Sequence, residues 1–294
     1  MLLRLGAAAR RICPFEFGVN VQLAYSTYAL QSVDPLEAVE RVCALGYEGL
    51  EVNCGDAWLT APQRFGESDR KRLREAFQNA GFPPPVIMNL IHLCAHDEEI
   101  AEKTGQLAAT CLLARELCWL DQPSVVTTTL GAQMDSWESA RETVANRLRS
   151  YADLAADHNV VLAAEAHVGQ EMDTPEKARW LVEAVDHPYL KLNFDYSHFL
   201  VLDIDLQHAL DLNAEYAVHT HIKDGHMVDG QVQFALPGDD RLDLVDYLQR
   251  VERSGLDVPI TVEVSAQIWR EPGYDPWGTA ARCFENFKRA RSAS

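Results

Sequence analysis

Acidic and histidine side chains recur at the ends of apolar segments in the second half of this sequence. Four consecutive segments each end in such a side chain, and these are Glu165, Asp195, His221 and Glu263. A lone carboxylate in apolar surroundings is costly unless it is paired or bound to a cation. Three carboxylates and an imidazole also repel one another unless a positive charge lies between them. The pattern therefore predicts that the four side chains bind one divalent metal ion.

The residue types of this predicted site narrow the choice of ion. Oxygen-rich ligation without cysteine suits Mn²⁺ best, with Mg²⁺, Co²⁺ or Zn²⁺ as alternatives. Side chains alternate along a strand, so only one histidine of VHTHIK can point inward at a given depth. His221 lies nearer the end of that segment than His219, and we expect it to be the ligand. A salt bridge within the core is the alternative role for Glu165 and Glu263, but their segments carry no nearby basic residue.

Further candidates surround the four ligands. His167 lies two residues after Glu165, on the same side of a strand, and is a candidate catalytic base. The candidate substrate-binding residues are His198, His92, Lys223 and Glu171. Lys223 is suited to stabilise a developing enolate oxygen, with a surface salt bridge as the alternative. His198 either contacts substrate or orients a ligand, or else it caps a helix, and His92 is equally compatible with a packed core.

These side chains need a scaffold that gathers the ends of successive strands. Short β-branched runs alternate with helical patterns, and the expected strands are residues 15–23, 47–53, 85–93, 124–130, 160–166, 189–196, 216–223 and 259–264. Eight strand–helix pairs predict an α/β fold, the (β/α)8 TIM barrel, in which functional residues lie at the C-terminal ends of the strands. An open doubly wound sheet is the alternative, but LAYSTY replaces the glycine-rich loop expected after its first strand. Tyr25 and Tyr28 within that segment offer aromatic faces for stacking on a sugar.

Composition limits the classes of protein to which the chain can belong. The 294 residues carry 26 basic and 44 acidic side chains, a net charge of −18, which disfavours nucleic-acid binding. No apolar run is long enough to cross a membrane. The 7 scattered cysteines indicate a reducing compartment, and we expect a cytoplasmic protein. We expect a single domain over residues 15–294, preceded by a lead-in at 1–14 for which a targeting remnant is the alternative.

The motifs AAEAHVG, LNFDYSHF, HTHIKD, LPGDD and ITVEV carry a resemblance that spans Phe15 to Phe287. The chain resembles the xylose isomerase-like TIM barrel superfamily, in its sugar phosphate isomerase/epimerase branch. This resemblance implies a Glu-Asp-His-Glu divalent metal site formed by Glu165, Asp195, His221 and Glu263. It also implies that Glu165 and Glu263 shuttle a proton and that His198 holds substrate oxygens.

The residues and the resemblance together predict a divalent-metal-dependent sugar isomerase or epimerase. Such an enzyme abstracts a proton next to a carbonyl and passes through a metal-stabilised enediolate. The alternative is a lyase that uses the same site for β-elimination, either an inosose-type dehydratase or a subunit that cleaves 3-oxo-glycosides or C-glycosides. The EAH sequence at Glu165 favours this alternative, with His167 or His92 as the base. A barrel that binds sugar without turnover is a third, non-enzymatic reading.

The expected partners follow from these readings. We expect a small sugar or sugar-derived substrate and a homo-oligomer. A small partner subunit would accompany the lyase alternative, and we expect neither nucleic acid nor a membrane as a partner.

Overall fold

The computed structural model of the chain describes residues 21–94, 96–131 and 136–293. Eight parallel strands form one sheet, in the order β10-β1-β2-β3-β4-β5-β6-β7. Their bounds are β1 Leu23–Ser26, β2 Gly49–Asn53, β3 Ile87–Met88, β4 Ser124–Thr129, β5 Val160–Glu165, β6 Leu190–Asp195, β7 Ala217–His221 and β10 Ile260–Val262. Ile222, directly after β7, bridges to Val262 of β10 in parallel and thereby closes the ring. The predicted (β/α)8 barrel is confirmed, whereas the predicted lead-in at 1–14 falls outside the described residues.

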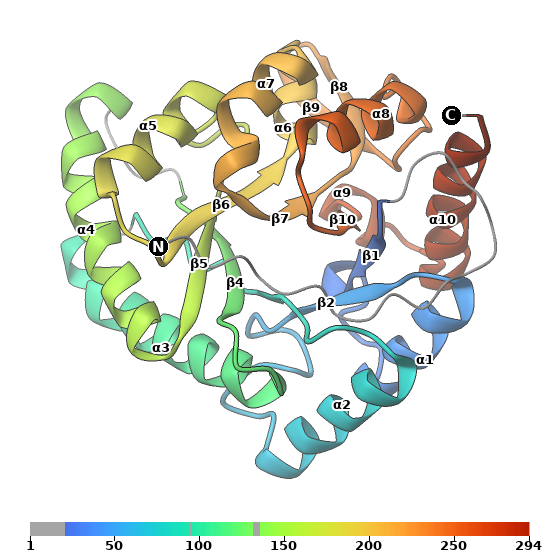
Figure 1. Cartoon of the computed structure of the whole chain (residues 1–294), viewed down its shortest axis with the longest axis horizontal. Helices are drawn as coiled ribbons and strands as arrows, with labels where there is room; N and C mark the ends of the chain where they lie inside the picture. Colours follow the sequence, from blue (N-terminus) through green and yellow to red (C-terminus); the bar gives the residue numbers. More distant parts are fainter. Residues whose placement is uncertain (1–20, 95, 132–135, 294) are drawn as a thin grey trace.

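Helices surround the ring of strands on its outer side (Figure 1). The longer ones are α1 Pro35–Leu45, α2 Glu67–Ala80, α3 Ile100–Leu117, α4 Trp137–Asp157, α5 Pro175–Val185, α7 Leu206–Asn213, α8 Leu244–Ser254 and α10 Pro276–Ala293. Local sequence signals set their ends. The Asp34 carboxylate accepts hydrogen bonds from the backbone N–H groups of Leu36 and Glu37 at the start of α1. Gly46 ends the same helix at φ +103°, a conformation that glycine adopts without strain.

The hydrophobic core lies between the strands and these helices. Val42 of α1, Phe77 of α2, Leu248 of α8 and Phe287 of α10 are among its fully buried side chains. Each comes from the inner face of an amphipathic helix, so the helices hold the barrel strands in a fixed register. The C-terminal ends of the strands are thereby held rigidly enough to position chemical groups.

Two expectations about the strands were wrong in detail. The first strand begins at Leu23 and runs through Ser26, so it includes residues that we had assigned to the loop after it. The third strand is only Ile87–Met88, because the chain turns away soon afterwards and His92 adopts φ +58°.

A two-stranded hairpin that the sequence analysis did not predict follows β7. Its strands are β8 Asp224–Val228 and β9 Gln231–Ala235, joined by Asp229 and Gly230, both at positive φ. Asp-Gly is a strong signal for such a two-residue turn. The buried carboxylate of Asp224 accepts hydrogen bonds from the backbone N–H groups of Gly238 and Leu242, at 3.1 and 3.0 Å. The LPGDD motif therefore serves to anchor this hairpin beside the end of β7.

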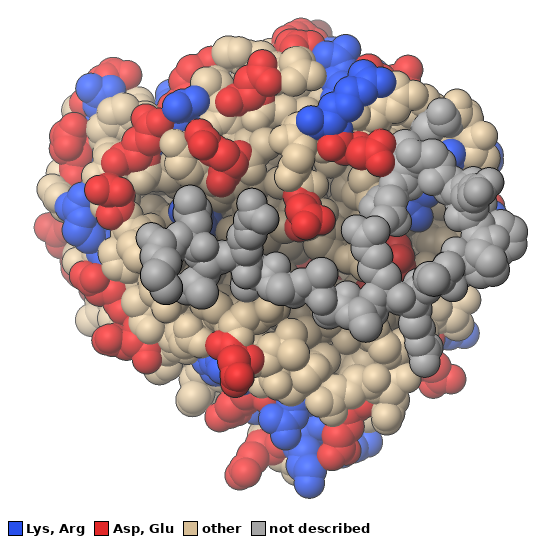
Figure 2. Space-filling model, viewed as in Figure 1, with Lys and Arg blue, Asp and Glu red and all other residues tan. Residues whose placement is uncertain are grey.

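Acidic side chains dominate the visible face of the molecule. Figure 2 shows Asp and Glu spread around the rim, with fewer Lys and Arg, some of which adjoin one another at the upper right. This distribution agrees with the net charge of −18. Among the described helices, none combines the length and the apolar character that a bilayer crossing requires.

Candidate metal centre and active site

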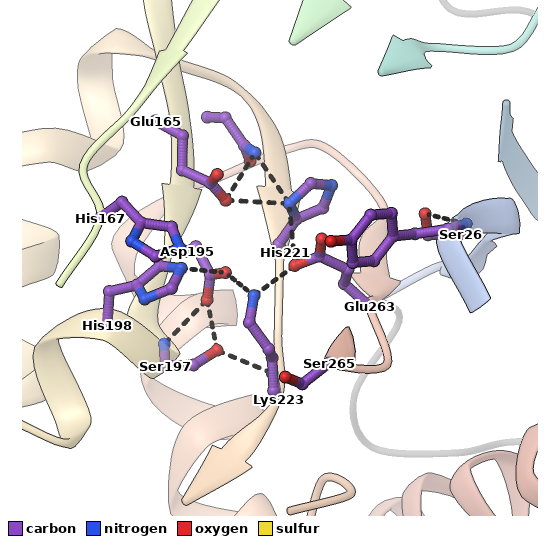
Figure 3. Close-up of polar contacts among 12 residues, drawn as sticks. Ser26, Glu165, His167, Asp195, Ser197, His198, His221, Lys223, Glu263 and Ser265 are labelled. Atoms are coloured by element: carbon purple, nitrogen blue, oxygen red, sulfur yellow. Dashed lines mark hydrogen bonds and ion pairs between the residues drawn. The ribbon is translucent and has the colours of Figure 1, made fainter. Parts of the chain in front are cut away.

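The four predicted metal ligands meet at the C-terminal edge of the barrel. Glu165 ends β5, Asp195 ends β6, His221 ends β7 and Glu263 directly follows β10. One ligand atom from each of these residues lies within 4.8 Å of the corresponding atoms of the others, and all four residues are buried. Figure 3 shows the side chains pointing toward a common centre. Three carboxylates and one imidazole form a donor set that fits a divalent cation.

Lys223 shows directly that this cluster accepts a cation. Its buried ammonium group contacts both Asp195 Oδ2 and Glu263 Oε2 (Figure 3). Although burial opposes the charged form of Lys223, the charges of Asp195 and Glu263 raise its pKa. The same ion pair holds the pKa of Asp195 well below its usual range, against the effect of burial. Lys223 is therefore no surface residue; it neutralises part of the charge that a metal ion would neutralise.

This contact leads to a prediction for Lys223→Met in metal-free protein. We expect the free energy of unfolding to fall by about 3–5 kcal/mol, because buried carboxylates lose their counter-charge. Saturating Mn²⁺ should restore most of this loss, since the ion supplies the missing charge. Thermal unfolding with EDTA or with Mn²⁺ measures both effects, and Lys288→Met, at an exposed position, is the control. An equal destabilisation with and without Mn²⁺ would contradict the assigned role of Lys223.

His221 presents one ring nitrogen to the cluster and the other to a residue that sequence reasoning missed. Its Nδ1 lies 3.0 Å from Glu165 Oε1, whereas its Nε2 lies 2.7 Å from Oε2 of Glu51. Asn193 Nδ2 also approaches His221 Nδ1, at 3.0 Å. When Nε2–H donates to Glu51, the lone pair of Nδ1 is left facing the other ligands, which is the tautomer that binds a metal.

Glu51 lies on β2, across the barrel interior from the ligand strands. It is buried, and His219 Nε2 contacts the same carboxylate oxygen at 2.7 Å. His221 and His219 hold the pKa of Glu51 low even though burial opposes the charged form. His219 contacts Glu51 and packs edge-on against the ring of His221, with ring centres 4.9 Å apart, but it does not belong to the four-residue cluster. This agrees with the choice of His221 as the ligand. A carboxylate inside the apolar segment GLEVN was the available signal for Glu51.

Glu165 of the cluster is suited to carry a proton. Burial, with the charges of Glu263 and Asp195, raises the pKa of Glu165. A carboxyl group that is shifted toward its protonated form in this way is a candidate acid–base group.

His167 lies beside the cluster with a free ring nitrogen. Its Nδ1 lies 2.6 Å from the carbonyl oxygen of Val168, so Nδ1–H donates there and Nε2 keeps its lone pair. Burial lowers the pKa of His167 to about 4, which keeps the imidazole neutral near pH 7. His167 also lines the cavity next to the ligands. His167 thus lies in the cavity wall beside the four clustered residues, and its role as a catalytic base stays a prediction.

His198 lies behind His167 rather than in the cavity wall. The two imidazole ring centres are 3.9 Å apart, and His198 is fully buried (Figure 3). Its Nε2 is 3.3 Å from Asp195 Oδ2, but neither ring nitrogen forms a hydrogen bond with a described residue. Substrate binding by His198 stays a prediction, and the geometry equally suits support of Asp195 and His167.

The remaining predicted residues divide between the cavity and its surroundings. His92 lines the cavity, and its Nδ1 lies 2.9 Å from Thr129 Oγ1. Glu171 does not line this cavity; it lies near enough to Cys94 for its charge to affect that thiol. Substrate binding by Glu171 therefore remains a prediction without support from its position.

We call the open space above the ligands the catalytic cavity. Its volume is about 560 Å³ when the space open to solvent is included. Its lining comes from the ends of β1, β3, β4, β5, β7 and β10 and the segments that follow them, and it consists of Tyr28, Leu90, His92, Thr129, Glu165, His167, Gln170, Lys223, Phe234, Glu263, Ser265 and Ala266. Tyr28 offers the predicted aromatic surface here. Tyr25 was wrongly assigned to the site, because it is fully buried against Tyr47 in the core.

Comparisons with known proteins give the family context of this site. A family model described as "Xylose isomerase-like TIM barrel" matches residues 39–287. A curated relative, the 3-dehydroshikimate dehydratase of Bacillus anthracis, is 30% identical over 135 residues, which are 45% of this chain and 46% of that protein. The match thus spans about half the length of this curated relative.

Solved structures with the same architecture have low sequence identity. D-Psicose 3-epimerase of Clostridium cellulolyticum H10, solved with D-tagatose, has a TM-score of 0.72 at 16% identity and covers 92% of this chain and 98% of its own. An IolI protein with a bound zinc atom has a TM-score of 0.74 at 18% identity and covers 92% of this chain and 96% of its own. At these identities the likeness establishes the fold alone.

Proposed function

Because the chain belongs to the xylose isomerase-like TIM barrel family, we propose that it is a divalent-metal-dependent sugar isomerase or epimerase. One observation carries this proposal: ligand atoms of Glu165, Asp195, His221 and Glu263 lie within 4.8 Å of one another at the C-terminal edge of the barrel. The adjoining cavity is lined by the acid–base groups of Glu165, His167 and Glu263.

We assign the metal to these four residues and favour Mn²⁺ because three of the four donors are carboxylates. A bound divalent ion supplies Lewis-acid polarisation of the substrate carbonyl. One of the two glutamates takes the proton from the carbon next to this carbonyl, and the C–H electron pair moves toward the carbonyl oxygen. Return of the proton to the other face of the same carbon gives epimerisation. Return to the former carbonyl carbon gives isomerisation: the hydroxyl on the carbon that lost its proton becomes the new carbonyl, and its O–H proton passes to the former carbonyl oxygen.

A specific observation favours a second candidate, a dehydratase or another β-eliminating lyase. His167 is neutral, lines the catalytic cavity and has its Nε2 free to accept a proton. In this reaction His167 takes the proton from the carbon next to the carbonyl. The electron pair forms a carbon–carbon double bond, and the bond to the substituent on the next carbon breaks, so that the substituent leaves with its bonding electrons. The curated relative of this chain is itself named as a dehydratase.

Hydrogen exchange in D₂O tests the proposed function. With Mn²⁺ present, we expect the protein to incorporate deuterium at the carbon beside the carbonyl of a ketose, since both epimerisation and isomerisation begin with loss of that proton. NMR or mass spectrometry measures the deuterium, and EDTA should abolish its incorporation.

The outcomes of this experiment separate the candidate functions. Release of water or of an aglycone from a 3-oxo sugar or 3-oxo-glycoside would favour the lyase. Metal binding without exchange or elimination, across ketoses and 3-oxo-glycosides alike, would contradict both enzymatic readings.

A further inference from the structure

A second cavity adjoins the catalytic cavity at the same edge of the barrel. It lies between the segments that follow β2 and β3 and one side of α3, and it has an empty volume of about 890 Å³. Leu90, two residues after β3, lines both cavities. Leu90 therefore lies between the two cavities, and a ligand long enough to pass it would contact both.

Amide side chains dominate the polar lining of the second cavity, and we call it the amide cavity. Asn53 at the end of β2 and Asn89 after β3 are joined there by Gln63 and Gln106. Asn53 Oδ1 accepts a hydrogen bond from the backbone N–H of Gly55 at 2.9 Å, which leaves the Nδ2 donor without a described partner. Asn89 Nδ2 donates to Thr110 Oγ1 at 2.9 Å, which leaves Oδ1 without a described donor.

These two free groups are complementary to hydroxyl groups. A hydroxyl both donates and accepts, so neighbouring hydroxyls of one ring can pair with a free amide donor and a free amide acceptor. Asn53 is only 1% exposed, so its hydrogen bond to a ligand would be largely shielded from water.

An aromatic surface and the charge balance of the lining further limit the chemical class of ligand that the amide cavity can bind. Trp58 lines the amide cavity, and it is held by stacking on Tyr28 with a ring separation of 5.5 Å. Its indole N–H donates to the backbone carbonyl of Thr27 at 3.1 Å, which fixes its orientation. The lining contains one cation, Lys103, and one anion, Asp56, so it does not concentrate positive charge as a phosphate site does.

We propose that the amide cavity binds a second, uncharged sugar ring of a substrate whose reacting ring occupies the catalytic cavity. The inference rests on the proposed function for the identity of the reacting ring. It adds that the substrate is a disaccharide or other glycoside rather than a free monosaccharide. Asn53 and Asn89 recognise hydroxyls of the second ring, and Trp58 packs against its C–H groups.

Calorimetric titration of the Mn²⁺-loaded protein tests this inference without requiring turnover. The ligands are D-fructose, which has one ring, and the ketose disaccharides lactulose and maltulose. We expect at least one disaccharide to bind about 10-fold or more tightly than fructose, because the amide cavity adds contacts worth about 1.4 kcal/mol or more.

Two variants and a control assign the added affinity to the amide cavity. Asn89→Leu removes the free acceptor, and Ala109→Phe fills space contributed by α3. Both should lower disaccharide affinity to that of fructose while fructose affinity stays unchanged, which also shows that the variants are folded. Gln78→Leu, an exposed amide on α2, should change neither affinity.

Failure of this inference is distinguishable from failure of the proposed function. Equal affinity of wild-type protein for fructose and both disaccharides would overturn the second-ring site, as would variants that weaken fructose and disaccharides equally. Tight disaccharide binding that is lost in the variants, without any deuterium exchange, would support the amide cavity and contradict the proposed isomerase or epimerase.

Discussion

Glu263→Gln is expected to lower the rate of metal-dependent proton exchange by about 10³-fold or more. The substitution keeps the size of the side chain but removes its negative charge and its ability to take a proton. It also removes one of the four converging ligand atoms and one of the two carboxylates that contact Lys223. Both the metal site and the acid–base pair are therefore damaged by one change of functional group.

Three measurements on the same preparation separate these effects. Metal content by mass spectrometry reports ligation, the initial rate of deuterium incorporation reports catalysis, and circular dichroism reports folding. Glu285→Gln, at an exposed position on α10, should leave all three unchanged. A Glu263→Gln protein with full metal content and an undiminished exchange rate would show that Glu263 is neither a ligand nor a proton carrier.

The ligand set was predictable because each ligand interrupts an apolar strand near its end. Burial of an unpaired carboxylate is costly in any fold, so Glu165, Asp195 and Glu263 had to share a cation or be paired. The barrel then determines that the ends of neighbouring parallel strands meet. The cost of burying a carboxylate and the topology of the barrel together explain why the convergence of these four side chains could be predicted from the sequence.

Glu51 is likewise a carboxylate inside an apolar strand, but the sequence does not show which residue it contacts. Its partner His221 lies 170 positions later in the chain and across the barrel interior. Alternation along a strand says which side of the sheet a residue faces, but not which opposite strand it reaches. For Lys223 the sequence left two alternatives open, because a long flexible side chain can turn toward solvent or toward the cluster, and only the three-dimensional charge distribution decides.

The position of His198 behind the cavity wall could also not be predicted from the sequence. Spacing places it one helical turn after Asp195, in the short helix α6, Tyr196–Leu200, which the analysis did not predict. That turn carries the His198 ring behind His167 instead of into the cavity wall. The hairpin of β8 and β9 was predictable from Asp229-Gly230, but its contribution of Phe234 to the catalytic cavity required the structure.

Glu51→Gln is expected to weaken divalent-metal binding by about 10–100-fold while leaving the fold intact. The carboxylate accepts the Nε2 proton of His221 and so directs the Nδ1 lone pair toward the other ligands. A neutral amide binds that proton less strongly, and it can also present its own N–H₂ group, which would turn the imidazole to the wrong tautomer. Competition titration with a chromophoric chelator gives the dissociation constant for Mn²⁺ or Co²⁺.

The exchange rate at saturating Mn²⁺ distinguishes a positioning role of Glu51 from a general structural role. If Glu51 acts through His221, the exchange rate should recover largely at saturating Mn²⁺, although the dissociation constant stays high. His219→Asn removes the other imidazole that contacts Glu51, at 2.7 Å. Its ring packs edge-on against that of His221, with ring centres 4.9 Å apart, but it is not one of the four ligands, and we expect this variant to change metal affinity much less. Unchanged affinity in Glu51→Gln, or equal losses in both variants, would show that the buried Glu51 carboxylate serves packing of the barrel interior rather than orientation of the metal ligand.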